Sequence, residues 1–74
     1  MYSVFLIVTN VFTGLSLYNI SFSYRKAGDW HRAIECAREA LHIWQAALPP
    51  SHPDVTMAQR LVCELEGYNI ARRA

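Results

Sequence analysis

Apolar residues recur at helical spacing along the middle of the chain. The first such stretch carries Leu17, Ile20, Ser21 and Tyr24. Their spacing of i, i+3, i+4 and i+7 places them on one face of an amphipathic helix, which we expect to end near Ala27. A helix with an apolar face needs another element to cover it, so the stretch predicts a packed neighbour.

Two further stretches repeat this pattern. The second has charged residues largely on one side and apolar residues at helical spacing on the other: Trp30, Ala33, Ile34, Ala37, Ala40, Leu41, Trp44 and Leu48. The third, from about residue 53, places on one face Ala58, Leu61, Val62, Leu65 and Tyr68. Because alanines let helices approach closely while the large residues fill the edges, the pattern predicts an all-α fold of three packed helices.

Two short corners separate the predicted helices. Gly28 supplies the left-handed residue that commonly follows a helix, and Asp29 is a good N-cap for the next one. At the second corner, Pro49 and Pro50 cannot lie inside a helix, because proline lacks the backbone N–H and clashes with the preceding turn. We therefore expect the second helix to end near Leu48.

The third predicted helix begins within the same proline-rich stretch, ALPPSHPDV (residues 47–55). Pro53 suits the first turn of a helix, where its missing N–H has no helical partner to lose. Either Ser51 or His52 can cap this helix, and Asp54 adds negative charge where the helix dipole favours it. The chain thus turns back at once, so that two helices pack side by side.

Residues 1–14 are apolar and uncharged, and the sequence leaves their structure open. Polar and small residues between positions 9 and 14 interrupt the run before it reaches the roughly 18 apolar residues of a membrane span. No positive charge precedes Arg25, as a secretory signal would require. Because β-branched residues are frequent, helix and strand both stay open. The alternatives are an element packed on the following helix, the stub of a longer chain, and an anchor formed by residues 2–13.

Length and charge limit the remaining possibilities. A chain of 74 residues forms one small domain at most, with a modest core. Seven Lys and Arg against six Asp and Glu give a net charge of +1, so we expect no nucleic acid partner and no general attraction to a membrane. Cys36 and Cys63 lie far apart without a CxxC motif, which predicts two buried thiols in a reducing, cytoplasmic compartment rather than a zinc site or a disulfide.

Candidate catalytic chemistry is sparse. His31, His42 and His52 are scattered over a helix start, a helix middle and a corner, with no carboxylate and nucleophile arranged around any of them. The pair His31 and Glu35 is typical of a solvated helix face. The three glycines are isolated, so there is no phosphate-binding loop. We expect no enzymatic activity, no metal site and no cofactor.

The stretch LYNISFSYRKAGDWHRAIECAREAL, residues 17–41, resembles a tetratricopeptide repeat. Eight positions fall in the register of that repeat: Leu17, Ile20, Ser21, Tyr24, Gly28, Trp30, Ala33 and Ala40. The continuation ALHIWQAALPPSHPDV is similar to the longer repeat of kinesin light chains, in which the second helix runs on and a His-Pro-Asp-Val sequence opens the next repeat. The resemblance covers residues 15–58 well. It implies an antiparallel helical hairpin of a solenoid over residues 15–50.

The sequence departs from this family at several positions. Ala37 stands where the family has a bulky residue, and Pro49 where it has glycine. In the third helix, Gln59 and Glu66 replace a large apolar residue and an aromatic one. We therefore interpret residues 51–74 as the first helix of a degenerate repeat or as a capping helix, whose polar outer face favours solubility.

The resemblance implies a protein-protein interaction module, either a scaffold or a peptide-binding surface, within a longer repeat array. In this family the concave surface is made mainly by first helices, and the asparagine that matches Asn19 grips a peptide backbone. The predicted peptide-binding residues on the first helix are Tyr18, Asn19, Phe22, Arg25 and Lys26. In this interpretation the aromatic rings form an apolar surface, and the two cations favour acidic groups.

Three alternatives stay open at this point. Asn19 is merely solvated if Tyr18 and Phe22 pack on the N-terminal segment. The chain is a small membrane-associated protein if residues 2–13 are an anchor, or a piece of a larger protein in which another domain is catalytic. Because about three stacked repeats are normally needed for a stable core, we also expect low stability or self-association through the apolar N-terminal segment.

Overall fold

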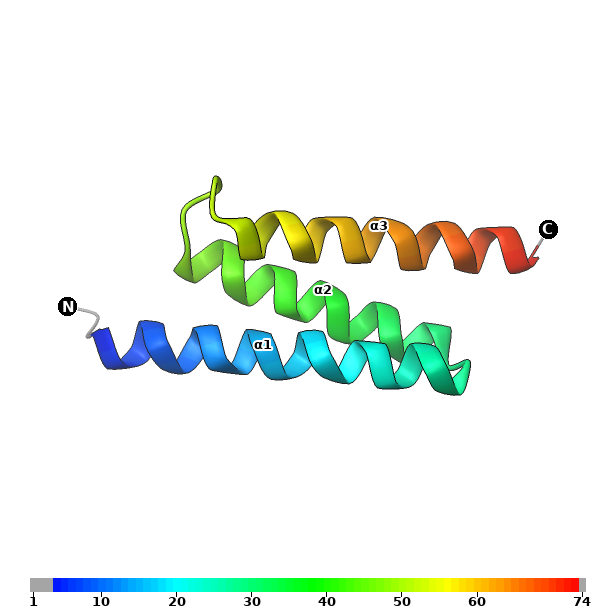
Figure 1. The fold of residues 1–74 in the computed structure, drawn as a ribbon, viewed down its shortest axis with the longest axis horizontal. Helices are drawn as coiled ribbons and strands as arrows, with labels where there is room; N and C mark the ends of the chain where they lie inside the picture. The colour runs from blue at the N-terminus through cyan, green and yellow to red at the C-terminus, as the bar shows by residue number, and fades with distance from the viewer. Residues whose placement is uncertain (1–3, 74) are drawn as a thin grey trace.

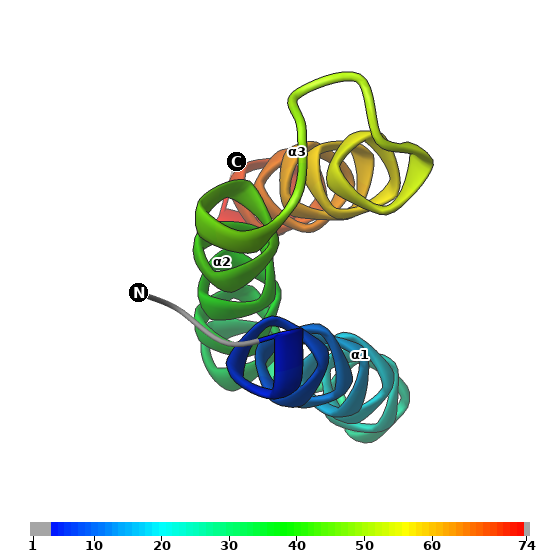
Figure 2. The same cartoon turned by 90° about the vertical axis from the view of Figure 1, so that its left-hand side faces the viewer.

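The computed structural model describes residues 4–73 and contains three helices. These are α1 (Val4–Ala27), α2 (Trp30–Ala47) and α3 (Pro53–Arg73). Figure 1 shows α2 between the other two and antiparallel to both. Seen end-on in Figure 2, α1 and α3 lie to the same side of α2, so the three helices form a curved layer with a concave side. The predicted all-α arrangement of antiparallel neighbours is confirmed.

The first helix begins much earlier than its apolar periodicity indicates. α1 continues without a break to Val4, so the described part of residues 1–14 is helical, and residues 1–3 lie outside the described range. A strand here would need a partner strand for its backbone groups, whereas a helix satisfies them internally. The indole Nε1 of Trp44 also donates to the carbonyl of Val11, at 3.1 Å, which fastens this part of α1 to α2.

Gly14 allows α1 and α2 to approach closely. A Cβ atom at this position would lie 2.3 Å from Nε1 of Trp44 and 2.7 Å from its Cδ1, far inside van der Waals contact. Trp44 is fully buried and packs with Val55 and Ala58 of α3 as well. The indole is therefore the point where all three helices meet at this end of the molecule.

The rest of the core lies between α2 and α3. Its buried residues are Ala33, Ile34, Ala37, Leu61, Val62 and Leu65. These positions confirm the apolar faces predicted for the second and third helices. Tyr68, which the pattern also placed on the buried face, is 50% exposed, and its ring stacks on Trp30 with centroids 5.5 Å apart.

The predicted buried face of α1 is only partly right. Ser21 is fully buried and its hydroxyl donates to the carbonyl of Tyr18 at 2.6 Å, but Ile20 is 43% exposed. The contact with α2 is centred on the small residues Gly14 and Ser21, which lie on one line of the helix. Since the closest approach follows these small side chains, the helix is rotated so that Ile20 points away from α2.

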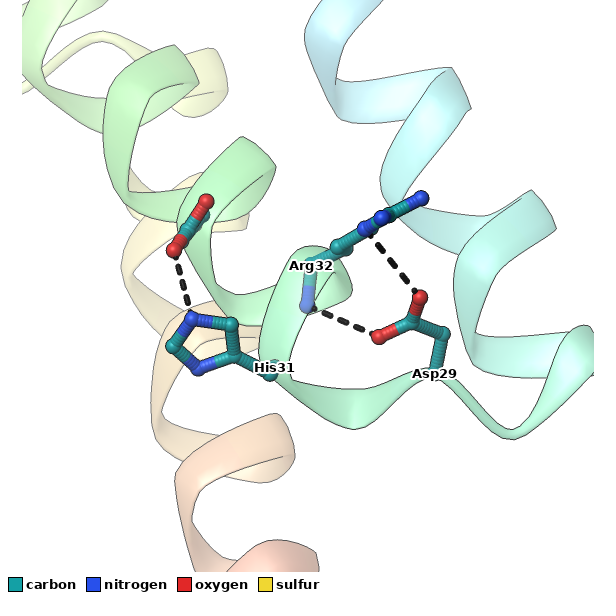
Figure 3. Close-up of polar contacts among 4 residues, drawn as sticks. Asp29, His31 and Arg32 are labelled. Carbon is teal, nitrogen blue, oxygen red and sulfur yellow. Dashed lines mark hydrogen bonds and ion pairs between the residues drawn. The ribbon is translucent and has the colours of Figure 1, made fainter.

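The first corner has the capping geometry that the sequence predicts. Gly28 has a φ of 81°, and its N–H donates to the carbonyl of Arg25. The next N–H, that of Asp29, donates to the carbonyl of Tyr24, which completes a Schellman motif. The Asp29 carboxylate accepts the backbone N–H of Arg32 and thereby caps α2, as Figure 3 shows.

At the second corner, α2 ends at Ala47 and Leu48 turns to an extended conformation. The cap of α3 is His52, not Ser51: its Nδ1 accepts the backbone N–H of Asp54 at 3.1 Å, and its carbonyl accepts that of Thr56. This bond requires an unprotonated Nδ1, because only a bare ring nitrogen accepts. Pro49 and Pro50 therefore follow the end of α2, and His52 caps the helix that begins at Pro53.

Candidate functional site

A hollow opens between α1 and α3 on the concave side of the molecule. It has a volume of about 180 Å³. Its lining comes from both helices: Tyr18, Phe22, Met57, Arg60, Leu61 and Glu64. Because α1 and α3 run in the same direction, each helix contributes successive turns to one wall of this groove. From here on, these six residues are called the α1–α3 groove.

The wall formed by α1 is aromatic, and the core supports it through a contact with Trp44. Tyr18 and Phe22 are one turn apart and meet edge to face, with ring centroids 5.0 Å apart. Tyr18 also packs on the buried Trp44, at 5.6 Å between centroids. Both rings are half-buried, so they offer an apolar surface whose position is set by the core.

The wall formed by α3 combines an apolar base with a charged rim. Leu61 is buried at the base, while Met57, one turn before it, is 41% exposed. Arg60 and Glu64 lie on the exposed side of the same helix. A methionine beside two aromatic rings gives a polarizable surface that adapts to differently shaped apolar groups.

Arg25 closes one end of the groove. Its Nη1 lies 3.9 Å from Oε2 of Glu64, and its guanidinium lies over the ring of Tyr68, 5.4 Å from the centroid. A partly exposed ion pair of this kind contributes little to stability, but together with the ring contact it links the last turns of α1 to α3. Arg25 is therefore engaged within the chain.

The structure separates the five predicted binding residues into three groups. Tyr18 and Phe22 line the α1–α3 groove, and Arg25 lies at its end. Asn19 and Lys26 are exposed and do not line it; seven residues apart, they share one side of α1, next to the aromatic wall. The alternative in which Tyr18 and Phe22 pack on the N-terminal segment is wrong for the described residues. As one continuous helix, α1 carries residues 4–14 away from these rings.

The sequence did not identify the wall contributed by α3. The missing residues are Met57, Arg60, Leu61 and Glu64. Periodicity correctly placed Leu61 on the apolar face of the third helix, but it gives no indication of which flank of that face meets the first helix. Which flank of the third helix lies near the first helix depends on the curvature of the three-helix layer. One signal for this contact was available in the sequence: the resemblance implies that both segments are first helices of repeats, and first helices form the concave surface.

Other candidate chemistry is confined to surface contacts. Nε2 of His31 lies 2.7 Å from Oε1 of Glu35, and both side chains are largely exposed; Figure 3 shows His31 beside the cap of α2. Burial, with the carboxylates of Glu39 and Glu35 nearby, raises the pKa of the Cys36 thiol, so this cysteine is not an activated nucleophile. Cys36 is half-buried and Cys63 is exposed, so the prediction of two buried thiols is wrong for Cys63. Among the described residues, no group of three or more His, Cys, Asp and Glu side chains converges as a metal site.

Comparison with known proteins places this arrangement in a family. A family model described as a tetratricopeptide repeat matches residues 13–54, which is more than half of the chain. No curated protein and no solved structure matches it. Across residues 4–73, no helix combines the length with the apolar character required to cross a bilayer. The chain belongs to the tetratricopeptide repeat family.

Proposed function

We propose that this tetratricopeptide repeat chain is a protein-protein interaction module that binds an extended peptide in the α1–α3 groove. The observation that supports the proposal most is the pair of half-buried rings, Tyr18 and Phe22, facing the exposed Met57 across an open hollow. Apolar side chains that the core holds in place but does not cover are typical of recognition surfaces. The family is a scaffold family without a catalytic role, so no reaction is proposed.

The chemistry of the groove favours one apolar side chain of the partner, flanked by acidic groups. The rings and the thioether accept the apolar side chain. Asn19, beside the aromatic wall, offers an amide that both donates to and accepts from an extended backbone. Because Arg25 is already paired with Glu64, we assign the attraction of acidic groups mainly to Lys26 and Arg60, which are exposed.

We further propose that the repeat is of the kinesin-light-chain-like type and part of a longer array in the cytoplasm. The continuation of α2 to Ala47 and the corner that leads into His52, Pro53 and Asp54 support this subtype. In that array, residues 51–74 are the first helix of a degenerate repeat or a capping helix. The exposure of Gln59, Cys63 and Gly67, on the side of α3 away from α2, supports this role.

A selection from a random peptide display library on the purified chain tests the peptide-binding proposal. We expect enrichment of sequences with an apolar residue next to acidic ones. Binding of an enriched synthetic peptide, measured by fluorescence anisotropy, is expected to weaken about tenfold or more in Phe22→Ala and in Met57→Ala, because each removes part of the apolar wall.

His31→Ala is the matched control, since His31 is exposed on α2 and lies outside the groove. It is expected to leave binding unchanged. The proposal is wrong if no sequence is enriched. It is also wrong if the Phe22 and Met57 variants keep a normal helical circular dichroism signal and bind the peptide as the parent chain does.

A further inference from the structure

α1 carries a second line of residues that does not face α2. Going along the helix, the line is Phe12, Leu15, Asn19, Phe22 and Lys26. Phe12 is 64% exposed and Leu15 is 43% exposed, while Phe22 is half-buried at the edge of the groove. Asn19 and Lys26 are exposed. We call these five residues the α1 seam.

The spacing of the α1 seam alternates between three and four residues. This is the a and d pattern of a heptad repeat, whose average of 3.5 residues keeps one face toward a partner helix. In the described part of the chain, α2 packs on a different line of α1, the one that contains Gly14 and Ser21. Of the seam residues, only Phe22 packs against the core cluster of α2 and α3, and the other four are exposed.

From this arrangement we infer that α1 pairs with α1 of a second copy of the chain, in parallel and in register. Asn19 selects this occupant. At an a position, the amide of Asn19 meets the same amide of the other copy, donor to acceptor, only when the two helices are parallel and aligned. In an antiparallel pair Asn19 would lie opposite an apolar side chain such as Leu15, with its hydrogen-bonding groups unsatisfied.

The flanks of the seam fit a close helical partner. On one side, Ser16 and Ser23 occupy the e positions; both are exposed, small and uncharged, so they neither obstruct nor repel a second helix. On the other side, Tyr18 and Arg25 are already engaged with Trp44 and Glu64. Lys26 closes the seam in the last turn of α1, where its long stem carries the ammonium group into water.

The contact area sets the strength of this dimer. From Phe12 to Lys26 the seam is about 21 Å long, and covering half the circumference of each helix removes about 360 Å² per copy from water. The total of about 700 Å² lies below the range of stable, specific interfaces and is typical of a weak, transient contact. The dimer is therefore reversible and dissociates on dilution.

The dimer also covers part of the proposed peptide site, because the seam includes Phe22 and Asn19. A second copy and a peptide consequently compete for α1. The inference itself rests on the spacing and exposure of the seam and not on the proposed peptide binding. Its test contains no peptide, so the two proposals fail independently.

Sedimentation velocity of the full chain over a range of concentrations tests the inference. We expect a shift from monomer to dimer as the concentration rises. Leu15→Glu is expected to weaken the dimer at least about 100-fold, because it places two unpaired carboxylates in an apolar seam. Ile20→Glu is the matched control: Ile20 is also 43% exposed, but it lies on another face of α1. It is expected to leave the dimer intact.

Disulfide trapping tests the parallel register. In a background with Cys36→Ser and Cys63→Ser, Asn19→Cys is expected to form an intermolecular disulfide at least about tenfold faster than Ile20→Cys, since only position 19 brings the two backbones within reach. Circular dichroism confirms that each variant is helical.

Three results would overturn the inference. The first is a chain that stays monomeric up to about 1 mM, a range in which even weak dimers form. The second is equal trapping at positions 19 and 20. The third is a seam that binds neutral lipid vesicles while the chain in solution remains monomeric, because the exposed face would then belong to a lipid surface.

Discussion

α1 and α3 flank the same helix, yet they bury opposite kinds of side chain. α3 presents to α2 a face of large and small apolar residues, all buried: Val55, Ala58, Leu61, Val62 and Leu65. α1 instead meets α2 through Gly14 and Ser21, with half-buried aromatic rings beside them. Its large aliphatic and aromatic residues Phe12, Leu15 and Ile20 are between 43% and 64% exposed.

This difference shows how one short chain both folds and recognises a partner. A contact built on small residues brings α1 close to α2 and lets Trp44 fill the space, so α1 is fixed without burying Phe12, Leu15 or Ile20. Phe12 and Leu15 lie on one side of α1 together with the half-buried Phe22, and a contiguous apolar surface of this kind marks an interaction site. In α3 most of the large apolar residues form the core, while Met57, Tyr68 and Ile70 are 41% to 68% exposed. We therefore regard α1 as the main recognition helix and α3 as the helix that contributes more to the core.

The largest expected effect is the loss of stability when an apolar side chain of α3 or of α1 is truncated to alanine. Leu65→Ala removes a fully buried side chain from α3 and is expected to lower the free energy of unfolding by about 2–5 kcal/mol. Ile20→Ala, on the exposed side of α1, is expected to cost about 0.5 kcal/mol or less beyond any change in helix propensity. Urea denaturation of both variants makes the comparison. Equal losses would show that α1 has an apolar core face like that of α3.

Gly14 in α1 and Gly67 in α3 allow a second comparison, which tests how closely each helix approaches its neighbours at these positions. Gly14→Ala is expected to destabilise the chain by about 1–3 kcal/mol, since the new Cβ would overlap the buried indole of Trp44. Gly67→Ala in α3 meets no atom within 4 Å and is expected to stabilise the chain by up to about 1 kcal/mol, because alanine is the better helix former. Thermal unfolding measures both. A Gly14→Ala variant with unchanged thermal stability would show that α1 and Trp44 are not in close contact at this position.

The helix caps allow a test of a smaller effect at the two corners. Asp29→Ala removes the side-chain acceptor of α2, and His52→Ala removes that of α3. Each is expected to cost about 0.5–2 kcal/mol, and replacement by Asn, which keeps an acceptor, is expected to recover most of the loss. Chemical denaturation of these four variants and of Ser51→Ala checks this. If His52→Ala is silent and Ser51→Ala is not, the cap of α3 is assigned to the wrong residue.

The smallest expected effect concerns thiol reactivity and reports whether the outer side of α3 is uncovered. Cys63 is exposed on that side, whereas Cys36 on α2 is half-buried and its thiol pKa is raised by burial and by Glu39 and Glu35. At pH 8 Cys63 is expected to react with iodoacetamide several-fold faster than Cys36. The Cys36 thiol ionises at a lower pH in the unfolded chain than in the folded one. The contribution of this thiol to the free energy of unfolding is therefore complete at neutral pH and is lost as the pH rises through the raised pKa of the folded chain. Peptide mapping by mass spectrometry measures the two rates. A protected Cys63 would mean that α3 is covered.

Local chemistry predicted much of this fold. The apolar stripe of α2, the turn at Gly28 and Asp29, and the start of α3 at Pro53 each depend on residues close together in sequence, and all are confirmed. The extent of α1 could not be predicted in the same way. Its β-branched N-terminal part is helical in a structure where Trp44, far along the chain, binds the carbonyl of Val11.

The candidate site was predictable only on one side. The aromatic wall of Tyr18 and Phe22 was identified from the first helix alone, but Met57 and Arg60 face it because of the curvature of the layer. Likewise, Arg25 is an exposed cation in the sequence pattern and becomes paired only when α3 brings Glu64 beside it. Relations between helices, set by side chains distant in sequence, account for each difference.

The most direct test of the central claim is to measure stability and self-association of one variant, Phe12→Ala. Phe12, at 64%, is the most exposed apolar member of the α1 seam. If α1 uses its large side chains for recognition, the unfolding free energy of the monomer, measured at a concentration where the dimer has dissociated, changes by less than about 0.5 kcal/mol. Dimer formation in sedimentation velocity is then lost or weakened at least about tenfold. A loss of about 2 kcal/mol in monomer stability, with self-association unchanged, would place Phe12 in the fold and contradict the account.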